Sequence, residues 1–144
     1  MPYCTLDLLT DRFGARMLIG LTDRAELATG TVDTDVVDRA IADADAVIDG
    51  HLRTRYALPM AEPIPALLTD IAMSIVGYKL HTSQPNPKIE TDYKDALRHL
   101  EAIAKGTIQL SAAGLSTGGA ATGSGARITD RERPFTEANL KGFI

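Results

Sequence analysis

Apolar residues over most of the chain recur at three- and four-residue steps, which is the spacing of one face of an α-helix. The clearest example begins at Asp33 or Thr34, either of which could cap a helix running to about Arg55. Its apolar side chains are Val37, Ala40, Ile41, Ala44, Val47, Ile48 and Leu52. A rise of 1.5 Å per residue gives this helix a length of about 33 Å, enough to span a small domain.

Two further long helices are predicted. Residues Pro65–His81 are apolar around most of the helix circumference and leave only a narrow polar stripe, which favours a position at the centre of a bundle. Three prolines in residues 57–65 indicate a turn before this helix. The last helix covers about residues 88–105, and Gly106 is placed to end it.

Two short helices are predicted ahead of the long ones. Thr5 is placed to cap a helix that ends at Phe13, just before Gly14, and a second helix would cover residues 15–21. The alternation typical of β-strands does not occur before residue 107. The predicted fold class is therefore all-α: a small helical bundle with two short and three long helices, followed by a Gly-rich spacer and an extended tail.

The sequence changes character after Gly106. Residues 107–126 carry no charge and are rich in Gly, Ser and Ala, a composition typical of a flexible linker. Residues 127–144 regain charge and large apolar side chains. We therefore divide the chain into a helical body (1–106), a linker (107–126) and a C-terminal docking segment (127–144), the alternative for the last being a frayed tail. The segment's expected contacts with a partner are Arg127, Arg131, Arg133, Phe135, Leu140 and Phe143.

The net charge of the chain argues against a protein that binds nucleic acid through its phosphates. The formal net charge is −4 over 144 residues, the wrong sign for neutralising phosphates. The N-terminus has no basic region, and Asp7 interrupts its apolar run, so we expect no signal peptide and an intracellular product. The longest uncharged stretch, residues 107–126, has too few apolar residues to cross a bilayer, so no membrane partner is expected.

Residues with catalytic or metal-binding potential are few. His51, His81 and His99 fall on three different predicted helices, each without a second ligand at i+3 or i+4, so no metal site is predicted. A single cysteine, Cys4, excludes an internal disulfide. The loop Asp23–Asp33 has acids at both ends but lacks the alternating ligands of a calcium loop. We expect no cofactor and no enzymatic activity.

A row of carboxylates follows the polar side of the first long helix. Such rows are most often solvated surfaces. The functional alternative is an electrostatic wall that repels phosphate over a Debye length of about 8 Å and lets DNA slide past. The candidates for a surface facing such a channel are Asp35, Asp38, Asp45 and Asp49.

Several strings, in order along the chain, carry a resemblance to a known family: YCTLDLLTDRFG, LIGLTDR, AVIDGHLRTRYALPM, PIPALLTDIAMSIVGYKLH, YKDALRHLEAIAKG and RPFTEANLKGF. They resemble the Mu-like phage neck proteins, which are the head–tail connectors, or adaptors, of long-tailed phages and Mu-like prophages. The resemblance covers most of the chain. It departs at residues 24–31, where relatives often carry a more acidic, glycine-containing stretch.

The resemblance implies a helical adaptor of the virion neck that is assembled in the cytoplasm of the bacterial host. Such adaptors form a ring, twelve-fold to match the portal, through which DNA passes as cargo. One side of the ring binds the portal protein and the other receives the next neck protein or the tail terminator. The residues favour a compact body with an adhesive tail, which agrees with this implication.

Two other function classes are alternatives to a connector. A small helical DNA-binding regulator would need a basic recognition helix, and none of the three long helices has one. An enzyme would require residues that converge from distant segments, and the sequence gives no local sign of them.

Overall fold

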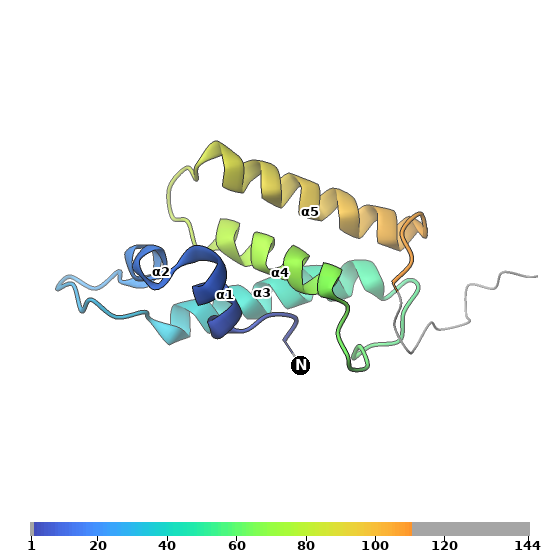
Figure 1. The fold of residues 1–144 in the computed structure, drawn as a ribbon, viewed down its shortest axis with the longest axis horizontal. Coiled ribbons are helices and arrows are strands. Elements are labelled where there is room, and N and C mark those ends of the chain that lie inside the picture. Colours follow the sequence, from blue (N-terminus) through green and yellow to red (C-terminus); the bar gives the residue numbers. More distant parts are fainter. Residues whose placement is uncertain (1, 111–144) are drawn as a thin grey trace, which may run out of the picture.

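The computed structural model describes residues 2–110, which contain five α-helices and no strand (Figure 1). The two short helices are α1 (Leu6–Phe13) and α2 (Ala15–Thr22). The three long helices are α3 (Thr34–Leu52), α4 (Ala66–Lys79) and α5 (Pro87–Lys105). The predicted all-α class, with two short and three long helices, is confirmed.

Side-chain caps fix the beginnings of three helices. The Thr5 hydroxyl accepts a hydrogen bond from the Leu8 amide at the start of α1. The Asp33 carboxylate accepts two such bonds at the start of α3, and Asn86 caps α5 in the same way. The residue types at Thr5 and Asp33 predict two of these caps. The predicted end of the long helix near Arg55 is about three residues late, because α3 ends at Leu52 and the chain then turns.

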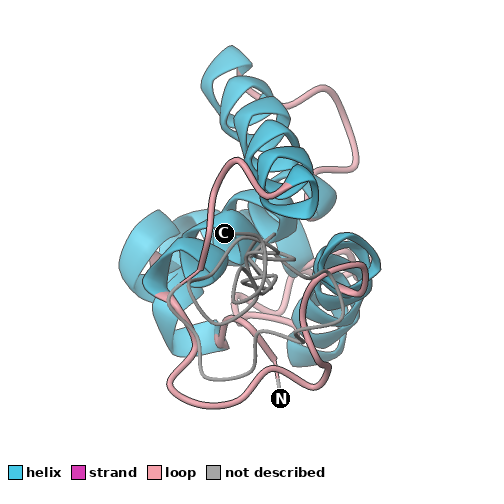
Figure 2. Cartoon of the chain, turned by 90° about the vertical axis from the view of Figure 1, so that its right-hand side faces the viewer, coloured by secondary structure: helices cyan, strands magenta, loops and turns pink. Residues whose placement is uncertain are grey.

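Helix α4 lies at the centre of the bundle, as its nearly continuous apolar surface predicts. It packs against α3 and α5 along its length and also contacts α1 (Figures 1 and 2). Burial of an aliphatic side chain stabilises the fold by about 1.5–3 kcal/mol. The fully buried side chains of α4 are Leu68, Ile71, Ala72, Ile75 and Val76.

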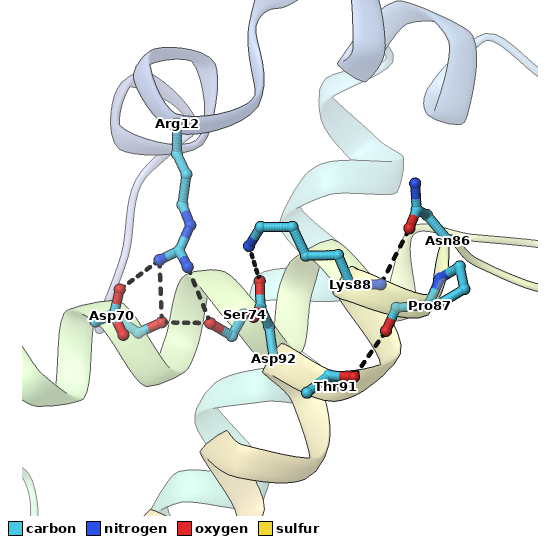
Figure 3. A network of polar contacts seen from close by, with 8 residues as sticks. All are labelled: Arg12, Asp70, Ser74, Asn86, Pro87, Lys88, Thr91 and Asp92. Carbon is cyan, nitrogen blue, oxygen red and sulfur yellow. Dashed lines mark hydrogen bonds and ion pairs between the residues drawn. The ribbon is translucent and has the colours of Figure 1, made fainter.

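A polar contact fastens α1 to this central helix. The Arg12 guanidinium reaches across to α4 and bonds the Asp70 carboxylate at 2.5 Å and the Ser74 hydroxyl at 3.3 Å (Figure 3). Nearby, Lys88 pairs with Asp92 one turn along α5, at 2.7 Å. The Arg12 bonds fix α1 beside α4, and α1 in turn positions the N-terminal residues against α3.

The packed body extends beyond the predicted boundary at residue 106. Ile108 packs against the core, and Leu110 is buried with its main-chain N–H donating to the Tyr56 hydroxyl at 3.0 Å. Packing against the core therefore continues to Leu110, the last described residue, and the division into body, linker and docking segment stays a prediction. The uncharged, Gly-rich composition of residues 107–126 gives no sign of this packing, because among the described residues only two apolar side chains at the start of the stretch contact the core. The rest of the predicted linker and the docking segment lie outside the described residues.

Candidate functional surfaces

The four aspartates predicted to face a channel all lie on α3 but differ in exposure. Asp35 and Asp38 are exposed, whereas Asp45 and Asp49 are half-buried beneath the N-terminal residues. Asp38 and Asp45 also line a shallow depression of about 410 Å³ together with Pro2 and residues of α1. The row is thus divided into an exposed part and a covered part.

Tyr3 holds the covered part of the row. Its main-chain N–H donates to Asp45 Oδ1 at 3.1 Å, and its hydroxyl donates to Asp49 Oδ1 at 2.5 Å. The Tyr3 side chain is buried, although it lies only two residues after the first methionine. A single residue thus binds two carboxylates one helical turn apart and fixes the N-terminal segment on α3.

These contacts change the ionisation of the groups involved. Burial raises the pKa of the Tyr3 phenol, and the hydrogen bond to Asp49 and the charges of Asp49 and Asp45 raise it further. Burial also raises the pKa of Asp45, an effect opposed by the bond from the Tyr3 N–H. The Asp45 and Asp49 carboxylates are thus engaged within the chain, and Asp35 and Asp38 are the exposed members of the row. That the four aspartates face a channel stays a prediction.

Cys4 is buried beside this cluster. Burial raises the pKa of its thiol to about 12, and the negative charge of Asp45 contributes to the rise. The thiolate is the reactive form of cysteine, so this side chain is protonated and unreactive at neutral pH.

Two of the three histidines bond a main-chain oxygen four residues earlier in the chain. Nδ1 of His51 lies 2.8 Å from the Val47 carbonyl oxygen, and Nδ1 of His81 lies 2.7 Å from that of Gly77. His99 is exposed. Within residues 2–110, no group of three His, Cys, Asp or Glu side chains lies close enough to hold a metal ion.

The loop from Asp23 to Asp33 is closed by its first carboxylate. Oδ2 of Asp23 accepts hydrogen bonds from the main-chain N–H groups of Thr29 and Gly30, at 2.8 and 2.9 Å. The Asp23 carboxylate thus accepts hydrogen bonds from main-chain groups of its own loop. At the tip, Leu27 is 84% exposed, the largest exposure of any large apolar side chain in the described part of the chain.

A basic pocket, unpredicted from the sequence, lies on the other flank of α3. Arg24, Arg39 and Lys79 line a space of about 210 Å³, with Asp43 the one carboxylate among its lining residues. Val36, Ala40 and Leu80 provide its apolar wall. The three cationic residues come from the loop after α2, from α3 and from the end of α4. No local motif could have brought them together, because their proximity depends on how the helices pack.

The residues predicted to bind a partner through the C-terminal segment lie outside the described residues. This group consists of Arg127, Arg131, Arg133, Phe135, Leu140 and Phe143. Their contacts stay a prediction. Within residues 2–110, no helix has both the length and the apolar character needed to cross a membrane.

The fold and its surfaces define a small all-α protein with an acidic surface on one flank of α3 and a basic pocket on the other. The family model described as "Bacteriophage Mu, Gp36" matches residues 3–128, and the chain belongs to that family. Gene product J of Escherichia phage Mu is 32% identical over 146 residues, covering 100% of both chains. The Mu-like prophage FluMu protein gp36 of Haemophilus influenzae is 33% identical over 116 residues, 79% of each chain. The resemblance to a Mu-like phage family is confirmed, and the chain is a phage protein.

Proposed function

We propose that this phage protein is a non-enzymatic structural component of the virion, a head–tail connector located at the neck. In this role a twelve-fold ring of copies binds the portal protein on one side and the next neck protein or tail terminator on the other. Packaged DNA passes through the ring as cargo. Assembly takes place in the cytoplasm of the bacterial host, without a membrane partner.

The observation that carries the proposal is the set of motifs that resembles the Mu-like neck proteins, and the match along the whole chain to gene product J of phage Mu supports it. This match includes both the helical body and the C-terminal segment. The names of these relatives state a phage origin and no more, so the connector role rests on the resemblance of the sequence motifs.

The physics of the chain supports an assembly role. Leu110, the last described residue, donates its main-chain N–H to the Tyr56 hydroxyl, and residues 111–144 follow it in the sequence. Ordering a segment costs about 1–2 kcal/mol per backbone residue, and burial of apolar side chains against a partner can offset that cost. Phe135, Leu140 and Phe143 are the side chains expected to bury area on the portal or on a neighbouring copy.

Deletion of the gene from an inducible phage or prophage tests the proposed role. We expect lysates that contain DNA-filled heads and complete tails in separate particles, with joining restored by the wild-type gene supplied in trans. A deletion that still yields joined, infectious particles would overturn the connector role.

A truncated gene tests the docking segment separately. Removal of residues 127–144 leaves every residue of the described body in place, so we expect normal helicity by circular dichroism and loss of attachment to heads. A truncated chain that attaches as well as the full chain would contradict the role of the segment.

Binding of duplex DNA discriminates between this role and a regulator. A connector through which DNA slides is expected to bind short duplexes weakly at physiological salt. A regulator would bind tightly, and its affinity would fall steeply with salt as counterions are released.

A further inference from the structure

The basic pocket carries positive charge that the described residues do not neutralise. Six ion pairs occur within residues 2–110, and neither Arg24 nor Arg39 takes part in one. The third cation, Lys79, makes only a long contact of 3.9 Å with Asp43. In a chain whose net charge is −4, a pocket with three cationic side chains and one carboxylate is a local exception.

Both arginines are held in place by main-chain oxygens. Arg24 donates from Nε to the Leu21 carbonyl at 3.1 Å and from Nη2 to the Leu80 carbonyl at 3.0 Å. Arg39 donates from Nε to the Asp35 carbonyl at 3.0 Å. A guanidinium has five N–H donors, so each retains others for a ligand. Because these side chains are already oriented, binding a carboxylate costs them less conformational entropy than it costs a free surface arginine.

The matching negative charge lies on the opposite flank of the same helix. Consecutive residues of an α-helix point about 100° apart, so Asp38 and its neighbour Arg39 face different directions. Asp38 lines the depression beside Pro2 and α1, with the half-buried Asp45 next to it, whereas Arg39 lines the pocket beside Lys79. One copy of the chain therefore presents an acidic surface and a basic surface on its two sides.

We propose that the pocket formed by Arg24, Arg39 and Lys79 is a subunit contact that binds the acidic flank of α3 of a second copy, with Asp38 as its main exposed carboxylate. Because the two surfaces differ, the contact is head-to-tail, and repeated contacts of this kind close into a ring when the rotation between copies permits. Opposite charges also set the register between copies.

This inference rests on the proposed ring and specifies how its copies meet. It moves Asp38 from the channel wall, where the sequence suggested it, to the boundary between copies. An arginine that lies against a carboxylate can form two parallel hydrogen bonds, which lysine cannot do, so Arg39 is expected to dominate the contact.

Charge reversal of the full-length chain tests the contact by sedimentation velocity. Wild-type protein is expected to self-associate at about 0.1 M salt and to dissociate toward 1 M, where the Debye length falls to about 3 Å. Arg39→Glu and Asp38→Lys each bring like charges together, so each alone is expected to weaken self-association at least about tenfold. Arg98→Glu and Glu101→Lys on the exposed side of α5 make the same changes of charge and are expected to have no effect.

Mixing the two variants gives the sharper result. In an alternating assembly the altered pocket of Arg39→Glu meets the altered flank of Asp38→Lys, while the remaining contacts are wild-type. We therefore expect an equimolar mixture, and also the double variant, to regain association within about threefold of wild type. Circular dichroism checks that each variant keeps its helices.

Three results would overturn the proposal. They are a wild-type chain that stays monomeric at all concentrations and low salt, single variants that associate normally, and a mixture that fails to recover. Loss of duplex DNA binding in Arg39→Glu with unchanged self-association would assign the pocket to phosphate instead. None of these results bears on whether deletion of the gene separates heads from tails, so the contact can fail while the connector role stands.

Discussion

The Cζ atom of the Phe13 ring lies 2.6 Å from the position that a Cβ atom on Gly77 would occupy. This glycine lies inside α4, and its φ is outside the left-handed region. Glycine is therefore required here because a larger side chain would not fit, and not because of the backbone conformation. We expect Gly77→Ala to displace the Phe13 ring and lower the free energy of unfolding by about 1–3 kcal/mol. Urea denaturation followed by circular dichroism measures the change.

Gly50 is the matched control, because it also lies inside a helix, α3. Nothing lies within 4 Å of the position that a Cβ atom on Gly50 would occupy. Gly50→Ala is expected to raise the free energy of unfolding by about 0.5–1 kcal/mol, since alanine has less freedom in the unfolded chain. Equal effects of the two substitutions would contradict the close approach of α1 to α4.

A second pair of glycines separates backbone strain from packing. Gly106, with φ of 81°, ends α5 in the left-handed conformation. A Cβ atom on Gly106 would clash with the Arg55 guanidinium. Gly30 has φ of 68° and nothing within 4 Å. Gly30→Ala is expected to cost about 1–2 kcal/mol from conformation alone. Gly106→Ala is expected to cost more, because the Arg55 side chain must also move. Thermal unfolding of both variants gives the difference, and an equal cost would argue against the Arg55 contact.

The helices could be predicted from the sequence, because their information is local. Apolar spacing predicted α3, α4 and α5, and the caps at Thr5 and Asp33 follow from residue type at a helix start. Gly77 falls on the narrow polar stripe of the predicted helix over residues 65–81, yet in the structure it is buried against Phe13. Local pattern shows that a face has small or polar residues, whereas tertiary packing decides what covers it.

The functional surfaces were harder to predict, because they depend on contacts between distant residues. Tyr3 bonds carboxylates more than 40 residues away in sequence, so the division of the aspartate row could not be seen. The basic pocket combines Arg24, Arg39 and Lys79 from three separate elements. The spacing of residues along the sequence does not predict contacts between separate elements. The acidic row could be predicted, because its members lie on one helix.

Removal of the Tyr3 hydroxyl tests how firmly the N-terminal segment is fixed to α3. Tyr3→Phe leaves the half-buried Asp49 carboxylate without this donor, and we expect the free energy of unfolding to fall by about 1–2 kcal/mol. Tyr93→Phe is the control, because that hydroxyl has no hydrogen-bond partner among residues 2–110 while the ring stacks on Tyr78. Chemical denaturation compares the two. A loss no greater than that of Tyr93→Phe would show that the Asp49 bond contributes nothing to stability.

The raised pKa of Asp45 gives stability a dependence on pH whose sign can be stated. The folded chain holds the Asp45 proton more tightly than the unfolded chain, in which the ordinary value is 3.8. Protonation of Asp45 therefore favours the fold, and this contribution is lost as the pH rises through the folded pKa. Asp45→Asn keeps an oxygen that can accept the Tyr3 N–H bond and has no charge to bury.

We expect the free energy of unfolding of wild type minus that of Asp45→Asn to increase as the pH falls from 7 toward 4. Urea titrations at several pH values measure it. Asp38→Asn, on the same helix but exposed, corrects for the loss of one negative charge from α3. A difference that is flat with pH, or that decreases toward low pH, would contradict the burial of the Asp45 carboxylate.

The last bond of the described body, from the Leu110 N–H to the Tyr56 hydroxyl, gives a local prediction. Tyr56→Phe removes the acceptor from a buried N–H group while the ring keeps filling its place in the core. We expect the free energy of unfolding to fall by about 0.5–1.5 kcal/mol and the Leu110 amide to exchange with solvent at least about fivefold faster. Amide exchange of the Ile103 region of α5 is the internal control, because its hydrogen bonds lie within the helix. If Leu110 instead exchanges at the same rate in both proteins, this bond does not hold the end of the body. Only the packing of Ile108 and Leu110 on the core would then hold this end of the described chain.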